Sequence, residues 1–464
     1  MFRNQIHLCI CLLCICLLIG ACGSGAKKTQ GTQTNTNTNN ELPIDITPKP
    51  IPPPTKVKTD SESTNNGSTI IIIPTDKNSG LNEIPDVEAR PYAPNIAIML
   101  PFQLNEYNPT MDSMDSIPRK TNLSAEFYEG IKIGLEHLKN EGISLNVQVY
   151  DTQNSPFEVN NILAKPEMKA SDLIIGPIYN KQLTEVAKFA KQNRIYAVSP
   201  LSPSDKITTN NPYYLMATPT IETQCAAMFD YIVNTYPNRN ILALSTSKPN
   251  ETNLASLFYR FATVNAANRE KYGYVDVTQV VSSIEDSETS IEAHLSPNKE
   301  NVIVVTSFDE LFINDLLRKL NMLKSRYRIT VFGMPNWMKM STLQLDYLAN
   351  LNFHITVPFW YNSNELSHQK FREDYLNTFK THPSNNANTG YDLITYFARN
   401  YHKYGERIEG KLDKSEIKGT FNNFYFNGAS SNQYNQSFSP TDYLENKYVN
   451  ILKYNSLFEL EKVN

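Results

Sequence analysis

Short apolar runs alternate with helical stripes along most of this chain, and that order leaves few folds open. The first run, from Ile96 to Leu100, is apolar throughout and ends at Pro101, a pattern typical of a strand buried on both faces of a sheet. A helical stripe follows, with apolar residues at Phe127, Ile131, Leu135 and Leu138. Three further runs, around Val147, around Ile174 and at 195–198, continue the alternation. This order predicts an α/β fold whose parallel sheet is flanked by helices.

The alternation restarts near residue 220 and predicts a second unit of similar size. It begins with a helix expected over 220–236. Further strands of this unit are expected at 241–244, 274–281, 302–306 and 329–332. A third stretch, from about residue 338, is expected to have helices, one strand at 353–357 and a terminal strand near 448–454. A chain of 464 residues is too long for one compact core, so two lobes with separate sheets are expected. In the first unit, Ser124 is expected to cap the first helix.

The N-terminus has the pattern of an export signal. Its apolar run from Leu8 to Ile19 is shorter than the ~20 residues that a membrane-spanning helix needs. Its end allows two interpretations: an ordinary secretory signal cleaved near Ala21, or a bacterial lipobox in which Cys22 is lipidated. Because Ile19-Gly20-Ala21-Cys22 is similar to a lipoprotein signal and a polar stretch follows it, we predict a signal peptide over 1–21 and lipidation of Cys22.

Residues 22–91 have the composition of a tether. The stretch is rich in Thr, Asn and Pro and has too few apolar residues to offset the entropy of ordering the chain. As a flexible coil, such a segment would span ~40–50 Å on average. Four isoleucines at 70–73 interrupt it, and they are either a short strand that docks on the body or an apolar spot in a linker. By resemblance to other lipoproteins, Gly23 in place of Asp implies the outer membrane, with the protein facing the periplasm.

Charge and cysteine content narrow the class of partners. The net charge is −4 and no basic face stands out, so the chain is not expected to bind nucleic acid. Five of the six cysteines lie at or before Cys22, which leaves Cys225 alone in the body. Cys225 shares a helical face with Met228 and Ile232, so we expect a buried apolar residue rather than a reactive thiol.

No recognisable catalytic or metal-binding pattern occurs in the sequence. There is no G-x-S-x-G, no Walker loop and no H-E-x-x-H. The seven histidines show no metal-ligand spacing, and the scattered carboxylates on helices are most simply solvated faces. We therefore predict a binding protein that is not an enzyme and that uses neither a metal nor a cofactor.

Several short motifs occur in the order found in a known family. They are Ala125-Glu126-Phe127-Tyr128-Glu129-Gly130, Val149-Tyr150-Asp151-Thr152, Ile174-Ile175-Gly176-Pro177, Val198-Ser199-Pro200, Gly390-Tyr391-Asp392, Gly419-Thr420-Phe421 and Phe426-Asn427-Gly428. With these motifs, the region from about residue 92 onward resembles the type I periplasmic-binding fold of the leucine/isoleucine/valine-binding proteins. The chain is also similar to outer-membrane lipoproteins that activate penicillin-binding proteins, whose C-terminal domain has this fold.

The resemblance implies two lobes joined by three chain crossings. The crossings are expected near residues 215–219, 334–338 and 433–439. Lobe 1 would then comprise about 92–216 and 338–434, and lobe 2 about 217–337 and 435–464. In such proteins the ligand lies between the lobes, at the carboxyl ends of the strands, where loops and helix N-termini converge.

Residues on these strand-end loops are the candidate ligand-binding residues. In lobe 1 they are Phe102, Gln103, Tyr179, Asn180, Ser202 and Ser204. In lobe 2 they are Ser245, Ser247, Asp309 and Asn336. For each of them, the alternative is an ordinary loop residue at the start of a helix.

The pattern departs from that of amino-acid binders, which use hydroxyl and backbone N–H groups for the carboxylate and an acid for the ammonium. Lys181 and Pro203 stand where hydroxyl residues are expected, and Asn336 stands where an acid is expected. A neutral Asn cannot hold a buried ammonium as a carboxylate does, although Asp309 could substitute for it. A free branched-chain amino acid is therefore a poor match.

Two functions are consistent with these observations. The first is a membrane-tethered lipoprotein that binds a small polar ligand between its lobes, such as an amino acid, a peptide or a cell-wall fragment. The second is a protein-interaction lipoprotein with a degenerate cleft that regulates peptidoglycan synthesis enzymes. The commonest use of the fold favours the first function, whereas the altered pocket and the long tether favour the second.

Overall fold

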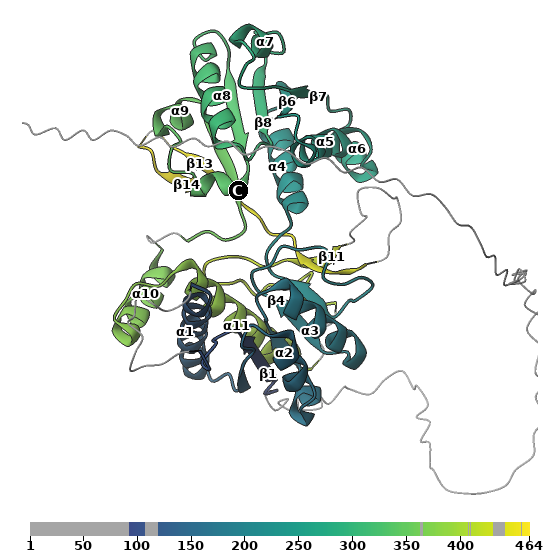
Figure 1. Ribbon diagram of the computed structural model, residues 1–464, viewed down its shortest axis with the longest axis vertical. Helices are drawn as coiled ribbons and strands as arrows, with labels where there is room; N and C mark the ends of the chain where they lie inside the picture. The colour runs from purple at the N-terminus through teal and green to yellow at the C-terminus, as the bar shows by residue number, and fades with distance from the viewer. Residues whose placement is uncertain are drawn as a thin grey trace, which may run out of the picture. The chain divides into compact units, whose positions relative to one another are not determined.

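The structure is a computed structural model, and it describes residues 92–106, 119–361, 365–406, 408, 410–429, 441–455 and 457–464. All of these residues belong to the unit Glu83–Asn464. They form two α/β lobes, each built on its own sheet (Figure 1). The predicted signal at 1–21, Cys22, the tether at 22–91 and the isoleucines at 70–73 lie outside the described residues.

Lobe 1 is built on a seven-stranded sheet in the order β11-β12-β5-β4-β3-β1-β2. Its strands are β1 Asn95–Leu100, β2 Asn146–Asp151, β3 Leu173–Ile175, β4 Tyr196–Ser199, β5 Tyr214–Met216, β11 Phe426–Ala429 and β12 Tyr443–Asn446. All neighbours pair in parallel except β11 and β12. The parallel sheet expected from the alternating pattern is confirmed, and β5, β11 and β12 extend it with strands that the apolar pattern does not predict.

Helices cover both faces of the lobe 1 sheet. They are α1 Arg119–Asn140, α2 Pro156–Leu163, the 3₁₀ helix η2 Pro166–Ala170, α3 Asn180–Asn193, α10 Leu366–Phe379 and α11 Asn385–Tyr404. Successive side chains of a strand point to opposite faces, so Ile98 packs in the core shared with α1 and α11, whereas Met99 packs in the core shared with α2 and α3. The fully apolar β1 is therefore buried on both faces, as its composition indicates.

Two glycines allow α1 and α11 to approach closely. A Cβ on Gly130 would lie 1.8 Å from the carbonyl oxygen of Ala387, and a Cβ on Gly390 would lie 2.1 Å from that of Phe127. No larger residue fits at either position without a backbone shift. The motifs that end in Gly130 and begin at Gly390 thus form the contact between these two helices.

Ser124 does not cap the first helix, contrary to the expectation. Helix α1 begins at Arg119, so Ser124 lies inside it and is fully buried. Its hydroxyl donates to the carbonyl oxygen of Pro101 at 3.1 Å, which fastens α1 to the end of β1. The sequence does not reveal that the helix begins before Ser124, because the first turn of α1 carries no apolar stripe.

Lobe 2 is built on a second seven-stranded sheet, in the order β14-β13-β10-β9-β8-β6-β7. Its strands are β6 Arg239–Ser245, β7 Val277–Val281, β8 Glu300–Val305, β9 Ile329–Gly333, β10 His354–Val357, β13 Asn450–Tyr454 and β14 Leu460–Lys462. Its helices are α4 Ile221–Thr235, α5 Pro249–Thr263, α6 Ala266–Tyr272, α7 Glu288–Glu292, α8 Glu310–Leu323, α9 Leu345–Asn350 and the 3₁₀ helix η3 Pro335–Lys339. Pairing is parallel from β7 to β10, and β13 joins antiparallel to β10 and β14.

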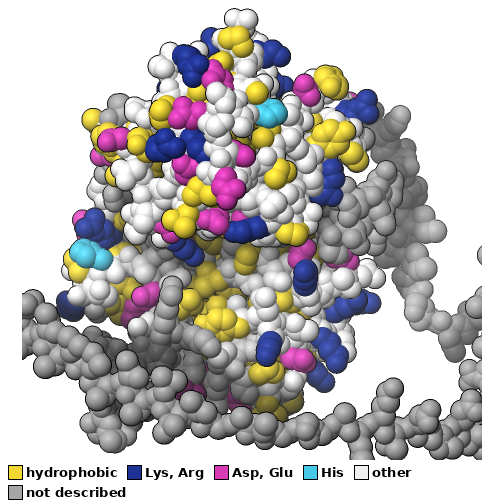
Figure 2. Space-filling model, turned by 45° about the horizontal axis from the view of Figure 1, so that its top comes forward, with side chains coloured by type: hydrophobic (Ala, Val, Ile, Leu, Met, Phe, Trp, Pro, Cys, Tyr) yellow, Lys and Arg dark blue, Asp and Glu magenta, His cyan; other side chains and the backbone are white. Residues whose placement is uncertain are grey.

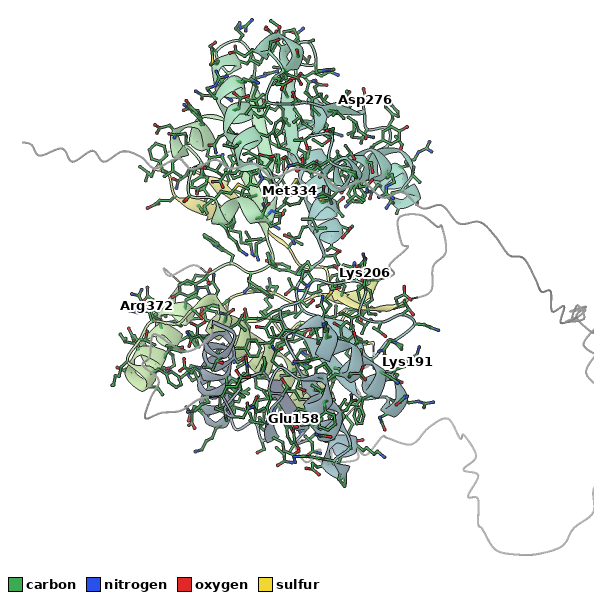
Figure 3. All side chains as sticks on the ribbon, in the orientation of Figure 1. Glu158, Lys191, Lys206, Asp276, Met334 and Arg372 are labelled. Atoms are coloured by element: carbon green, nitrogen blue, oxygen red, sulfur yellow. The ribbon has the colours of Figure 1, made fainter. Side chains whose placement is uncertain are left out.

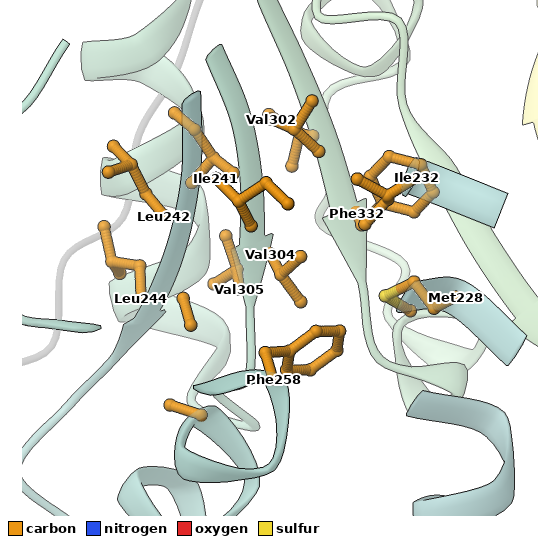
Figure 4. Close-up of a cluster of buried hydrophobic side chains, with 14 of the residues drawn as sticks. Met228, Ile232, Ile241, Leu242, Leu244, Phe258, Val302, Val304, Val305 and Phe332 are labelled. Atoms are coloured by element: carbon orange, nitrogen blue, oxygen red, sulfur yellow. The ribbon is translucent and has the colours of Figure 1, made fainter. Parts of the chain in front are cut away.

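The core of lobe 2 is formed by residues of α4, α5, α8 and the strands of the sheet, and Figure 4 shows part of it. Met228 and Ile232 of α4 pack there with Val304 and Phe332 of the sheet. Cys225 lies on the same face of α4 and is only 1% exposed. Burial raises the pKa of its thiol, and the expectation that Cys225 is a buried residue is confirmed.

Two of the three expected crossings need correction. The sequence places the strand at 353–357 in lobe 1, but β10 pairs in parallel with β9 of lobe 2. Residues 338–357 therefore belong to lobe 2. The second crossing follows Val357 instead of lying at 334–338. The expected third crossing at 433–439 is also displaced, because β12 still belongs to lobe 1 and β13 to lobe 2, which places it at 447–449. The first crossing lies at 217–220, between β5 and α4, and overlaps the expected region at 215–219.

Buried side chains tie the crossings together. The carboxylate of Glu445 accepts from the backbone N–H of Thr220 at 2.7 Å and from its hydroxyl at 2.8 Å, and it pairs with Lys447 at 2.5 Å. The side-chain oxygen of Asn422 accepts from the N–H of Trp360 at 2.7 Å and from Asn450 at 3.2 Å. The first crossing is thus fastened to the third, and the second crossing is fastened to the third through Asn422.

Candidate functional site

The first candidate residues lie on the loop after β1, and Asp151 at the end of β2 holds this loop in place. Asp151 accepts from the backbone N–H of Gln103 at 3.0 Å and of Leu104 at 2.9 Å. Gln103 adopts a left-handed backbone conformation, with φ 57°. Phe102 packs edge-on against Tyr128 of α1, with ring centroids 5.6 Å apart. Both carboxylate oxygens of Asp151 therefore accept hydrogen bonds from the backbone of this loop.

Three further candidates in lobe 1 form one hydrogen-bonded chain. Asn180 is the first residue of α3, and its side-chain oxygen accepts from the hydroxyl of Ser202 at 2.5 Å. The Ser202 oxygen in turn accepts from the N–H of Ser204 at 3.3 Å. The loops after β3 and β4 are thereby joined. The structure brings Asn180, Ser202 and Ser204 together, and these residues form hydrogen bonds with one another.

A polar hollow of about 630 Å³ lies beside the start of α3. Tyr179 and Asn180 line it together with Asn154 and Gln182, which sequence reasoning did not single out. Gln182 donates to Asn154 at 3.2 Å and accepts from the hydroxyl of Thr152 at 3.3 Å. The side chain of Tyr179, at the cap position of α3, does not cap the helix. This hollow can accept a polar group at the strand ends of lobe 1.

In lobe 2 the candidate acid is already paired. Asp309 caps α8 by accepting from the N–H of Phe312 at 3.3 Å, and it forms an ion pair of 2.8 Å with Lys248. The hydrogen bond from Lys248, followed by that from the Phe312 N–H, holds the pKa of Asp309 below its ordinary value. Ser245 is buried at the end of β6, whereas Ser247 is exposed.

The buried carboxylate of Glu251 connects the loop after β6 to the loop after β8 in lobe 2. Glu251 is only 1% exposed, and its carboxylate accepts from the hydroxyl of Thr246 at 2.5 Å and from the N–H of Phe308 at 3.1 Å. The loop after β6 is therefore tied to the loop after β8. Sequence reasoning missed Glu251 and Lys248 because the contacts that place them at the site, with Phe308 and Asp309, join residues more than fifty positions apart.

Asn336 lies on η3, directly after β9, next to the Met334 labelled in Figure 3. Its side-chain oxygen is buried and makes no hydrogen bond within the described part of the chain. The neighbouring Trp337 is buried and donates from its indole N–H to the carbonyl oxygen of Ser307 at 3.0 Å. An unpaired amide oxygen can accept a hydrogen bond from a ligand, but it supplies no negative charge.

Large apolar side chains are exposed on the loop after β1 and in the first turns of α2 and α8, which follow the ends of β2 and β8. Leu104 and Phe157 in lobe 1 are 64% and 74% exposed, and Leu311 at the start of α8 in lobe 2 is 75% exposed. Figure 2 shows that apolar side chains lie among the charged ones on the visible face of the described residues. Each of these side chains offers apolar surface that a larger partner could cover.

Taken with their partners, the candidate residues supply no nucleophile–base pair. Within the described ranges, no cluster of three or more His, Cys, Asp or Glu side chains could hold a metal ion. No helix within those ranges is both long and apolar enough to cross a membrane. The arrangement can bind a group through hydrogen bonds and apolar contacts.

Comparisons with solved structures show the same two-lobed fold. A branched-chain amino acid ABC transporter protein from Rhodospirillum rubrum is 11% identical, with a TM-score of 0.53 over 80% of this chain and 100% of that one. A periplasmic ligand-binding protein of a branched-chain amino acid ABC transporter from Burkholderia xenovorans is 11% identical, with a TM-score of 0.51 over 80% and 94%. LpoA from Haemophilus influenzae is 13% identical, with a TM-score of 0.49 over 81% and 60%. At these identities the likeness concerns the fold.

The sequence itself matches a family model. No curated protein sequence matched the chain. The model described as periplasmic binding protein matches residues 121–427, which is more than half of the chain. The match begins within α1 and ends within β11, so it includes elements of both lobes. The resemblance inferred from the sequence motifs is confirmed, and the chain belongs to the periplasmic binding protein family.

Proposed function

We propose that this chain is a lipid-anchored, non-catalytic binding protein of the cell envelope that recognises a partner polypeptide at its strand-end loops. Membership of a family of binding proteins supports the binding role. The lipobox at Cys22 and the polar composition of 22–91 support an anchor and a tether. The absence of Asp at residue 23 supports the outer membrane, with the protein facing the periplasm.

The pairing of Asp309 with Lys248 is the observation that carries this proposal. An amino-acid ligand needs a carboxylate for its ammonium group, and Asp309 is the acid among the candidates on the strand-end loops. Its charge is balanced by Lys248 at 2.8 Å, and Asn336 is neutral. An ammonium group that binds here would have to compete with Lys248 for this carboxylate. A free amino acid is therefore disfavoured.

The exposed apolar residues indicate a larger partner. Leu104, Phe157 and Leu311 are each more than 60% exposed, and a small polar solute would gain nothing from covering them. A polypeptide surface would bury them and gain free energy in proportion to the apolar area removed from water. The resemblance to lipoprotein activators implies a peptidoglycan synthesis enzyme as the class of partner.

A small polar ligand is the second candidate function, and the hollow beside Asn180 favours it. Its volume of about 630 Å³ lies within the range of ligand pockets, and polar side chains line it together with Pro156 and Ile178. An amino acid, a short peptide or a cell-wall fragment would use the amides of Asn154 and Gln182 there. This function differs from the first in needing a soluble ligand that stabilises the protein.

Site-specific photo-crosslinking in intact envelopes tests the proposed function. A photoreactive residue at Leu311 should trap one defined protein, whereas the same residue at Leu366, an 82% exposed position on α10, serves as the matched control and should trap none. The Leu311 adduct should persist in Asn180→Ala, which removes a polar group of the hollow. Equal trapping at both positions would show that no specific surface is involved.

A thermal-shift screen of the full chain separates the two candidate functions. Free amino acids and muropeptides should leave the melting temperature unchanged under the partner proposal, because Asp309 is paired with Lys248 and Asn336 supplies no charge for an ammonium group. A ligand that raises the melting temperature by several degrees, and whose effect is lost in Asn180→Ala, would instead establish the small-ligand function. Asp309→Asn keeps the helix cap and so tests the acid without removing the capping oxygen.

A further inference from the structure

Lobe 2 carries a second pocket that the candidate residues do not include. It has a volume of about 250 Å³ and lies between η3, α9 and the strands β10 and β13. Trp337 and Phe353 form part of its lining, with Met338, Met340 and Leu345 around them. None of the charged residue types lines it, and Ser341 supplies a hydroxyl. Because its lining combines apolar side chains with polar groups, among them the hydroxyl of Tyr454, the pocket suits an uncharged group with an apolar body.

The aromatic part of this lining is held in place before any ligand arrives. The rings of Trp337 and Phe353 are stacked, with centroids 5.4 Å apart and planes 10° apart. The indole N–H of Trp337 is fastened to Ser307. A Cβ on Gly333 would lie 2.7 Å from the Trp337 ring and 2.8 Å from the Phe353 ring, so the strand must carry glycine here. A preorganised pocket loses little conformational entropy when it is filled.

The rim of the pocket extends its apolar surface outward. Met338 is 43% exposed and Leu345 is 49% exposed. Methionine is flexible and polarisable, so Met338 and Met340 can adapt to side chains of different shapes. A ligand no larger than the pocket would leave this rim in water. The occupant must therefore carry further apolar surface outside the inserted group.

The volume limits what enters the pocket. An apolar cavity of about 150 Å³ holds a benzene molecule, whereas pockets for whole ligands begin near 300 Å³. A pocket of about 250 Å³ thus fits one aromatic or large aliphatic side chain. Met338 at the pocket lies on η3, the same 3₁₀ helix that carries Asn336 directly after β9.

We propose that this pocket receives one aromatic or large aliphatic side chain of the partner polypeptide. The proposal rests on the proposed function, because it assigns an anchor site to the same interaction. Interfaces are commonly dominated by a few such anchors that fill preformed pockets. The pocket supplies apolar recognition, and the exposed residues of the strand-end loops supply the surrounding contact.

Fluorescence of Trp337 in the full chain tests this site directly. Trp360→Phe removes the other tryptophan of the sequence and keeps the backbone N–H that binds Asn422, so Trp337 is the reporter. The probes are capped tripeptides with Gly on either side of Phe, Leu, Ala or Asp. The Phe and Leu peptides should change the Trp337 emission saturably, with dissociation constants at least tenfold lower than those of the Ala and Asp peptides.

Two surface variants and one control assign the effect to the pocket. Leu345→Glu places a charge at the rim, and Ser341→Leu fills part of the space; both positions are exposed, so folding should be preserved. Each should weaken the Phe peptide at least tenfold. Leu366→Glu makes the same change as the first variant at an exposed leucine on α10 and should leave binding unchanged. Matching melting temperatures verify that the variants are folded.

The possible outcomes separate this proposal from the proposed function. Three results would overturn the anchor pocket while leaving the Leu311 crosslink intact. They are the absence of a saturable emission change with the Phe peptide, equal binding of the Phe and Asp peptides, and unaltered binding of the Phe peptide by both variants. Tighter binding of free benzyl alcohol than of the Phe peptide would make the pocket a small-molecule site. Emission that changes with protein concentration alone would make the occupant a second copy. Specific peptide binding without any Leu311 adduct would instead count against the proposed function.

Discussion

Replacing Asp392 by Asn should remove a pH dependence of stability between pH 5 and pH 8. Asp392 lies on α11, is 1% exposed, and accepts from the backbone N–H groups of Thr420 at 2.6 Å, Phe421 at 3.1 Å and Asn422 at 2.9 Å. Burial raises the pKa of Asp392 to about 7, although these hydrogen bonds act to lower it. The group thus titrates in the range where most carboxylates are already ionised.

The sign of the effect follows from linkage. The folded-state pKa of Asp392 exceeds its ordinary value of 3.8, so the folded protein binds this proton more tightly than the unfolded chain. The resulting stabilisation is complete below pH 3.8 and is lost as the pH rises through 7. At 1.36 kcal/mol per pKa unit, about 3 kcal/mol of unfolding free energy is lost between pH 5 and pH 8.

The assay is urea unfolding of the full chain at pH 5, 6, 7 and 8, followed by the fluorescence of Trp360 in a Trp337→Phe background. Trp360 is a suitable reporter because its N–H donates to Asn422, in the loop that Asp392 holds. The difference in unfolding free energy between the parent and Asp392→Asn should shrink by about 3 kcal/mol over this range. Taking the difference in unfolding free energy between parent and variant cancels the contributions of other titrating groups. One of these is His354, because burial lowers the pKa of His354 to about 4.

Asp315→Asn provides the matched control. Burial acts to raise the pKa of Asp315, but hydrogen bonds from Lys319 and Arg318 outweigh it and hold the pKa below its ordinary value. Its contribution is therefore lost only as the pH falls below about 3.8, and the Asp315→Asn difference should stay constant from pH 5 to pH 8. A constant difference for Asp392→Asn as well would refute the reasoning, because it would mean that three backbone donors outweigh burial and keep Asp392 ionised.

Three further predictions test the packing and the anchor. Gly390→Ala should lower the free energy of unfolding by about 1–3 kcal/mol, because its Cβ would lie 2.1 Å from the Phe127 carbonyl oxygen; a variant that unfolds at the parent urea concentration would contradict this. Cys22→Ser should move the protein from the membrane to the soluble fraction, and a variant that still fractionates with membrane after signal cleavage would disprove lipidation. Limited proteolysis should cut within 23–90 and leave a stable fragment starting near Tyr92; failure of residues 92–464 to fold alone would place the isoleucines at 70–73 in the core.

Local pattern was sufficient to predict most strands and their burial. Ile96 to Leu100 are apolar at every position because β1 is covered on both faces, and that requirement is visible in the residues themselves. The stripe through Cys225 and Met228 is equally local, since it reflects which face of α4 meets the sheet. By contrast, β11 and β12 are short and partly polar, so they carry no such signal.

For the candidate site, sequence alone placed residues at strand ends but not their partners. Asn180 and Ser202 follow neighbouring strands, so their proximity could be anticipated from the order of a parallel sheet. The pairing of Asp309 with Lys248 could not, because the two residues are 61 positions apart and many other lysines could have met this acid. That single contact changes the interpretation of the site from an ammonium-binding acid to a neutralised one.

The sequence by itself determined that this chain forms two α/β lobes, because the period and extent of apolar residues report which faces are buried. It did not determine where the lobes divide. The strand at 354–357 has the same local pattern whichever sheet it joins, and only its pairing with β9 assigns it to lobe 2. Strand partners and ion pairs depend on contacts between distant parts of the chain, and each segment satisfies its local preferences equally well with several partners. The tertiary structure selects among them because the whole set must be packed and hydrogen-bonded at once.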